Sequence, residues 1–277
     1  MVDSLFPGAF AGARRGQSMG VEKRILITND DGLAAEGLRA LAESLRRVAP
    51  VIIVAPDQEQ SASSHAITLD KPLRIKEHAP DTYGVSGTPT DCVLLAIHGI
   101  LDRKPDLIIS GINHGPNMGE DVTYSGTVAA AIEGCILGIS SMAVSLASWE
   151  LASFEGAATA AQLLARKLFE LEGGKARLWN VNVPAVGRDQ IKGIKVTKLG
   201  SRIYNDLIIK KKDPRGKDYF WIGGGEPGWS TEENTDFAAV SAGFISVTPL
   251  RLDFTDYDGI AELKGQRLEW NRETTTR

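Results

Sequence analysis

Short apolar runs that alternate with helix-patterned segments constrain the fold of this chain most strongly. Residues 24–28 (RILIT), 51–55 (VIIVA) and 107–110 (LIIS) are apolar runs of strand length, and such runs are typical of strands buried on both faces of a sheet. Between the first two, leucines recur at helical spacing from about residue 34 to residue 48. This alternation favours crossover connections and predicts an α/β fold with a Rossmann-like, doubly wound, mostly parallel sheet.

The same pattern continues to about residue 182. Further core elements are expected as helices over 88–100, 126–137 and 154–171 and as strands over 141–146 and 177–182. Two short strands over 73–75 and 82–85 are expected to form a small antiparallel insertion, and residues 111–124 a long loop.

Beyond Pro184 the pattern changes to short strand-like runs separated by turn residues. We expect strands near 194–198, 207–209, 219–222 and 244–248 and a short helix near 258–267. Tyr219, Phe220 and Trp221 would lie on a projecting hairpin, where exposed aromatic side chains favour a contact between subunits.

The chain is therefore expected to have three parts. Residues 23–185 would form the α/β core, and residues 186–277 a β-hairpin-rich extension that mediates oligomerisation. Residues 1–22 lack a helical or strand period and are expected to be a disordered extension, with a targeting or docking arm as the alternative.

Composition excludes several classes of function. Lys and Arg number 31 and Asp and Glu 35, a net charge of −4, which gives no basic footprint for nucleic-acid polymers or anionic membranes. The two cysteines provide no disulfide scaffold, and the four histidines show no HxxxH or HxH spacing for zinc. No apolar run approaches the ~18 residues of a membrane span, so we expect a cytoplasmic protein.

Polar residues follow three of the expected strands. Asp30 and Asp31 come after the first strand, serines after the second, and Asn113 after the third. Ligands bind at the carboxyl ends of parallel strands, where these loops would converge. Adjacent carboxylates with hydroxyl and amide oxygens suit a hard divalent cation; the alternative is a solvated Asp-Asp-Gly turn.

A second candidate site is Ser125-Gly126-Thr127, which directly precedes a helix of small residues. A helix start of this kind can bind phosphate through backbone N–H groups, or it can be an ordinary N-cap. GxGxxG, P-loop and G-x-S-x-G motifs are absent from the sequence. The sequence leaves open whether His65 and His114 contact phosphate and whether Glu120 and Asp121 line the pocket.

Four segments resemble the SurE family of survival-protein nucleotidases. They are ILITNDDG at 25–32, APDQEQSASSHAIT at 55–68, GTPTDCV at 87–93 and SGINHGPNMGEDVTYSGTVAAAIEG at 110–134. The resemblance extends over roughly residues 23–265 and leaves the first 22 residues outside it.

The resemblance implies a metal-dependent phosphomonoesterase that hydrolyses nucleoside 5′- and 3′-monophosphates and cleaves short polyphosphate. One divalent cation, Mg²⁺ or Mn²⁺ with Ca²⁺ as an alternative, is implied, and so is a homodimer or homotetramer built by the hairpin and a swapped tail. The implied metal ligands are Asp30, Asp31, Ser61 and Asn113, of which Asp30, Asp31 and Asn113 are also expected to be catalytic. The implied substrate-binding residues are Asn117, Ser125, Gly126 and Thr127.

Two alternatives concern the chemistry. We expect water to attack phosphorus directly, with a phospho-aspartate intermediate as the rival; the carboxylates here are adjacent, whereas phosphatases of the rival class use DxD spacing. The alternative to an enzyme is a non-catalytic nucleotide-binding regulator, and a purely structural oligomer is a more distant one.

Overall fold

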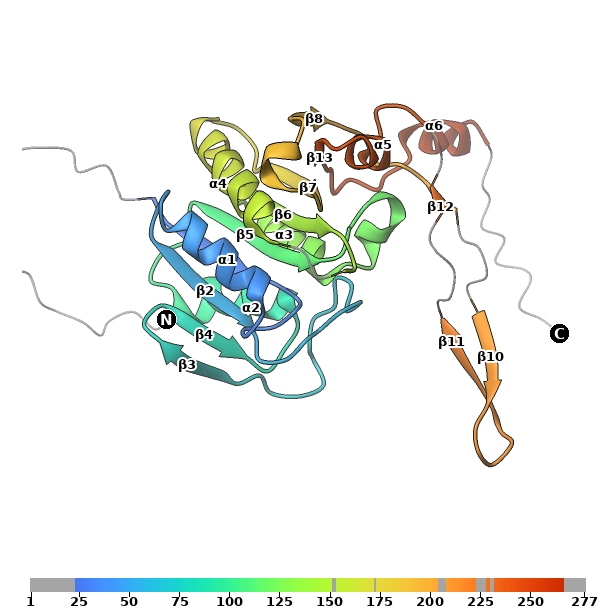
Figure 1. Cartoon of the computed structure of the whole chain (residues 1–277), viewed down its shortest axis with the longest axis horizontal. Coiled ribbons are helices and arrows are strands. Elements are labelled where there is room, and N and C mark those ends of the chain that lie inside the picture. Colours follow the sequence, from blue (N-terminus) through green and yellow to red (C-terminus); the bar gives the residue numbers. More distant parts are fainter. Residues whose placement is uncertain are drawn as a thin grey trace, which may run out of the picture.

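A nine-stranded sheet with helices on both faces forms the body of the protein (Figure 1). The computed structural model describes residues 23–150, 153–171, 173–203, 208–222, 228–229 and 232–266. The strand order is β3-β4-β2-β1-β5-β6-β7-β13-β8. Strands β4, β2, β1, β5, β6 and β7 are parallel, which confirms the predicted α/β fold with a mostly parallel sheet.

The elements have the following bounds. The strands of the sheet are β1 (Ile25–Thr28), β2 (Val51–Pro56), β3 (Ile75–Ala79), β4 (Thr82–Val85), β5 (Leu107–His114), β6 (Ser141–Ala147), β7 (Leu178–Pro184), β8 (Ile194–Val196) and β13 (Ile245–Pro249). The helices are α1 (Glu36–Leu45), α2 (Pro89–Leu95), α3 (Gly126–Ile136), α4 (Glu155–Glu170), α5 (Asp236–Ser241) and α6 (Tyr257–Gly265), with shorter turns η1 (Ala96–Ile100), η2 (Gly119–Thr123) and η3 (Arg188–Gln190).

Alternation along β1 divides the core between the two faces of the sheet. Ile25 and Ile27 belong to the cluster that contains the apolar faces of α1 and α4. Leu26 belongs to the cluster that contains Cys92 and Val93 of α2. Because side chains of a strand point alternately to opposite faces, this apolar run fills both layers and fixes β1 at the centre of the sheet.

The expected loop over 111–124 begins later than the sequence indicated. Strand β5 continues to His114, because Asn113 and His114 pair with Ser145 and Leu146 of β6 after a register irregularity. The rest of that segment contains the short turn η2. Pairing with β6 therefore fixes the position of Asn113 at the carboxyl end of β5, which a loop would not do.

Three further elements differ from expectation. The expected insertion is part of the main sheet, since β4 pairs in parallel with β2 and antiparallel with β3. The helix expected over 88–100 is α-helical only to Leu95 and ends in the π-helical turn η1. Helix α5 was not expected; its apolar positions are too few to give a periodic signal.

Beyond β7 the sheet continues with β13, which pairs antiparallel with β7 and parallel with β8. Part of the expected C-terminal extension is thus continuous with the sheet of the core. Within the described residues, no helix is both long and apolar enough to cross a membrane.

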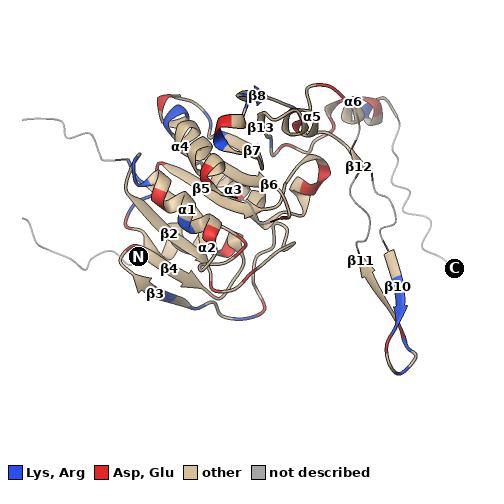
Figure 2. Ribbon diagram, viewed as in Figure 1, with Lys and Arg blue, Asp and Glu red and all other residues tan. Residues whose placement is uncertain are grey.

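A two-stranded hairpin of β10 (Ile208–Lys212) and β11 (Asp218–Ile222) projects from the body (Figure 1). A second small pair joins β9 (Arg202–Ile203) and β12 (Gly228–Trp229). Lysines give β10 its positive charge (Figure 2). Phe220 and Trp221 are exposed on β11, as the sequence predicted, whereas residues 1–22 and the end of the expected tail lie outside the described residues.

Candidate functional site

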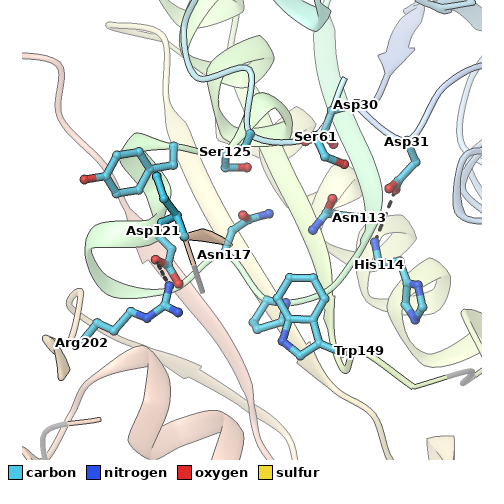
Figure 3. Close-up of a pocket in the computed structure, with 14 residues that line it drawn as sticks. Asp30, Asp31, Ser61, Asn113, His114, Asn117, Asp121, Ser125, Trp149 and Arg202 are labelled. Atoms are coloured by element: carbon cyan, nitrogen blue, oxygen red, sulfur yellow. Dashed lines mark hydrogen bonds and ion pairs between the residues drawn. The ribbon is translucent and has the colours of Figure 1, made fainter. Parts of the chain in front are cut away.

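A cavity of about 490 Å³ opens at the carboxyl ends of the central strands (Figure 3). Six of the eight residues predicted as metal ligands or substrate contacts line this cavity: Asp30, Asp31, Ser61, Asn113, Asn117 and Ser125. They come from the ends of β1 and β5, from the loop after β2 and from the start of α3. The parallel topology therefore brings together residues that are far apart in the chain.

Asp30 lies at the buried end of the cavity. The residue is 4% exposed, and its carboxylate accepts a hydrogen bond from the Thr127 hydroxyl. The same hydroxyl lies 3.2 Å from Oδ1 of Asn113, while Nδ2 of Asn113 donates to the Gly115 carbonyl at 2.8 Å. Burial raises the pKa of Asp30, although the hydrogen bond from Thr127 partly offsets it.

Asp31 is less buried than Asp30 and lies close to the charge of the Asp30 carboxylate. Its carboxylate accepts a hydrogen bond from the His114 N–H, with an N···O distance of 3.4 Å (Figure 3). Burial, and after it the charge of Asp30, raises the pKa of Asp31 to about 6. Two carboxyl groups that both resist ionisation share one end of the cavity, and a cation there would favour their charged forms.

The loop after β2 brings one serine into the cavity. The loop is tied to the turn after β1 by a hydrogen bond from the Gln60 N–H to the Asp30 carbonyl at 2.7 Å. Ser61 lines the cavity and donates its hydroxyl to Glu59 at 2.6 Å. Ser64 instead donates to the Thr123 carbonyl, and the Ser63 hydroxyl is buried beside Gly126. Geometry thus distinguishes three serines that sequence alone could not.

The donor chemistry of the cavity fits a hard divalent cation. Asp30 and Asp31 supply carboxylates, Asn113 an amide oxygen and Ser61 a hydroxyl, all of which are oxygen ligands. The described residues contain no group of three or more His, Cys, Asp or Glu side chains able to hold a metal. A site here would therefore use neutral oxygen donors beside the two carboxylates.

Helix α3 begins directly against Asp30. The Ser125 hydroxyl accepts a hydrogen bond from the Val128 N–H at 3.1 Å, which makes it the N-cap. A Cβ atom at Gly126 would lie 2.8 Å from the Asp30 Cβ and 2.8 Å from the Ser63 Oγ, so only glycine permits this approach. The Thr127 side chain is fully buried and its hydroxyl faces Asp30. The first N–H groups of α3 have no partner within the helix and suit an anion.

Asn117 is fixed by three buried side chains of β6 and β7. Its backbone N–H donates to Asn182 Oδ1 at 2.9 Å, and its carbonyl accepts hydrogen bonds from Asn180 and Asn182 at 2.7 and 2.9 Å. Its own side-chain amide donates to the Ser145 hydroxyl at 2.9 Å. This network fixes the Asn117 side chain in the cavity wall, while the residues that hold it do not line the cavity.

Some cavity residues had no signal in the sequence. Trp149 follows the end of β6 and could have been found by applying the strand-end rule there. Arg202, which forms an ion pair with Asp121 (Figure 3), lies beyond the four family-like segments, where no motif marks it. Tyr124 also lines the cavity, and so do His114 and Asp121, whose positions the sequence left open; Glu120 is not among the lining residues.

His65 and the two cysteines lie apart from the cavity. His65 Nε2 lies 2.8 Å from the carboxylate of Glu133 on α3. This histidine lines a separate apolar pocket. Cys92 and Cys135 are free thiols on helices α2 and α3, buried and half-buried respectively.

Comparison with known proteins gives a consistent result. The family model described as survival protein SurE matches residues 25–206. A protein from Syntrophotalea carbinolica named 5′-nucleotidase SurE is 50% identical over 235 residues, which are 84% of this chain and 93% of that protein. A protein of the same name from Geobacter sulfurreducens is 48% identical over 241 residues, 87% of this chain and 92% of that protein. The crystal structure of the SurE protein from Aquifex aeolicus matches with a TM-score of 0.80 at 44% identity, over 87% of this chain and 98% of that one.

Proposed function

Because the chain belongs to the SurE family, we propose that it is a divalent-metal-dependent 5′-nucleotidase that hydrolyses nucleoside monophosphates to nucleoside and phosphate. The observation that carries this proposal is the position of the Asp30–Asp31 pair. The pair lies at one end of a cavity whose adjacent wall is the N-terminus of α3. A cation site and an anion site side by side suit a phosphate monoester.

The donor set assigns each residue a part in the reaction. Asp30, Asp31, Ser61 and Asn113 would hold one Mg²⁺ or Mn²⁺ ion, which supplies Lewis-acid polarisation of phosphate and activates water. The start of α3 at Gly126 and Thr127 would bind the phosphate, with the Gly126 N–H on a phosphoryl oxygen as charge develops there, since the Thr127 N–H already acts on the Asp30 carboxylate. Asn117 would contact the substrate from the cavity wall, and Ser125 would keep the helix start in place.

Direct attack of water on phosphorus fits the environment of Asp30 better than a phospho-aspartate intermediate. The Asp30 carboxylate is buried, and one of its oxygens accepts the Thr127 hydroxyl. An in-line nucleophile would need a free oxygen facing the phosphate. The stereochemical course at a phosphorus made chiral with oxygen isotopes tests this: one direct displacement by water is expected to invert the configuration, and retention would support the covalent route, which needs two displacements.

Three finer properties belong to the same proposal. Hydrolysis of 3′-monophosphates and of short polyphosphate is supported by the size of the cavity, about 490 Å³, which leaves room for different leaving groups beyond the cation and phosphate residues. Assembly into a homodimer or homotetramer is supported by the hairpin, since an isolated two-stranded hairpin has little stability in water and this one exposes Phe220 and Trp221.

Phosphate release from nucleoside 5′- and 3′-monophosphates and short polyphosphate, measured with EDTA and again with Mn²⁺ or Mg²⁺ restored, tests the proposal. Release that stops with chelator and returns with metal is expected. Asp30→Asn should reduce turnover by orders of magnitude and leave the thermal melt in place, whereas Asp70→Asn, an exposed site outside the cavity, should change neither. Calorimetric binding of nucleotide by a folded protein that releases no phosphate would instead support a binding regulator.

A further inference from the structure

We propose that Trp149 is the platform on which the nucleobase of the substrate stacks, which makes it a residue that distinguishes nucleotides from other phosphate monoesters. The inference rests on the proposed nucleotidase function. It assigns a contact to the nucleobase, the part of the substrate that the metal and phosphate residues do not reach. It starts from the position of the indole in the cavity, just beyond the end of β6.

The indole of Trp149 is highly exposed, yet one side of it packs against the protein. Its side chain is 71% exposed, yet a Cβ atom at Gly115 would lie 2.3 Å from its Cζ3 and 2.6 Å from its Cη2. The ring therefore rests against the backbone of Gly115, whose positive φ of 118° also disfavours any side chain there. One side of the indole is supported by protein, and much of the ring remains open to a ligand.

The turn that carries Trp149 is held from both sides. The Ser148 N–H donates to the Leu146 carbonyl at 2.8 Å, and the Glu150 N–H donates to the Ser148 hydroxyl at 3.0 Å. Nε2 of His114 lies 2.9 Å from the Glu150 carbonyl. These contacts join the ends of β5 and β6, so little ordering is needed when a ring stacks on the indole.

The distribution of groups in the cavity favours a base at this position. In the view of Figure 3, Asn113 and Asn117 lie between Trp149 and the end of the cavity that holds Asp30 and Ser125. Tyr124 is the other exposed aromatic residue of the cavity, but it adjoins the N-cap of α3 and so would meet the phosphate or the ribose first. A nucleotide whose phosphate lies at α3 would place its base, the group beyond the ribose, against Trp149.

The test compares substrates that share a phosphate and a ribose but differ in the base. Trp149→Leu is expected to raise KM for AMP at least fivefold, since removal of an aromatic platform weakens base binding by roughly five- to 150-fold. The KM for ribose 5-phosphate, or its inhibition constant against AMP if it is turned over slowly, should change less than twofold. Trp149→Phe, which keeps a π face, should retain most of the affinity for AMP.

Three results would overturn the inference. Trp149→Leu could raise KM for AMP and for ribose 5-phosphate by the same factor, or Trp149→Leu and Trp149→Phe could have the same KM for AMP. KM for AMP could also stay unchanged in both variants. Failure of the proposed function looks different, because the wild-type protein would then release no phosphate from either compound. In that case, calorimetric binding of AMP to the wild type and to both variants still decides whether Trp149 holds the base.

Discussion

The hydroxyl of Thr127, in the first turn of α3, donates to the carboxylate of Asp30 at the end of β1, 97 residues earlier in the chain. This contact joins the helix that would bind phosphate to the residue that would bind the cation. It also offsets part of the effect of burial on the pKa of Asp30. The side chains of the two halves of the site are thus linked by a hydrogen bond between buried groups.

Thr127→Val keeps the shape of this side chain and removes its hydroxyl. We expect affinity for Mn²⁺ to fall by about 10- to 100-fold, the usual effect of losing a hydrogen bond to a metal ligand, because the ionised form of Asp30 loses its donor. A Mn²⁺ titration of phosphate release measures this. Thr127→Ser, which retains the hydroxyl, is the control, and equal metal affinity in both variants would contradict the linkage.

The pH dependence of stability in metal-free protein provides a second prediction. The pKa of Asp31 is about 6 in the folded chain, above its ordinary value of 3.8. Folding therefore favours the protonated form, so the contribution of this group to stability is fully present below about pH 4 and is lost as the pH rises through about 6. With EDTA present, the melting temperature of Asp31→Asn minus that of the wild type should increase across this range.

The same measurement has an internal control. A divalent cation favours the charged carboxylates, so saturating Mg²⁺ at neutral pH should reduce or reverse the advantage of Asp31→Asn. A difference in melting temperature that is equal at about pH 4 and about pH 7 in EDTA would show that burial does not act on Asp31 as described.

Asn182 should act on the reaction through Asn117. Asn182→Ala removes the acceptor for the Asn117 N–H and a donor to its carbonyl, so we expect a lower kcat and a loss of about 1–3 kcal/mol in stability. In the Asn117→Ala background, the same substitution should have little further effect on kcat, because interacting positions are not additive. Additive losses of kcat in the double variant would indicate a general structural role.

The projecting hairpin supplies a prediction about assembly. Trp221→Asp places a charge on the exposed apolar face of β11, and if that face is covered by another subunit, burial of the charge opposes association. Light scattering should show a shift toward monomer, with phosphate release measured alongside. An unchanged mass would place the subunit contact elsewhere. The control is Lys212→Asp, a substitution at a charged position of the same hairpin, which should leave the mass unchanged.

The sequence was most informative where local pattern and tertiary position agree. The run at 24–28 predicts a central strand because its neighbours in the sheet require it to be apolar on both faces, and β1 has that position. The convergence of Asp30, Ser61 and Asn113 followed from the topology of parallel sheets. The choice of Ser61 over Ser63 required the resemblance, because the path of a loop is set by contacts that no local pattern records.

The differences have a common cause. Strand β5 extends through Gly111-Ile112-Asn113-His114 because β6 pairs with it, and the polar, glycine-containing sequence alone resembles a loop. Trp149 and Arg202 reach the cavity through tertiary packing of segments that carry no motif. Helix α5 is too short to show a period.

The register of β1 against β5, in which Ile25 pairs with Leu107, has a consequence for how activity arises during folding. Asp30 and Asn113 come into range only after the chain between them has crossed the sheet and returned. Contacts so distant in sequence form late and slowly. A refolding chain should therefore regain helical circular dichroism before it regains phosphate release, and enzymatic activity becomes a reporter of completed sheet topology.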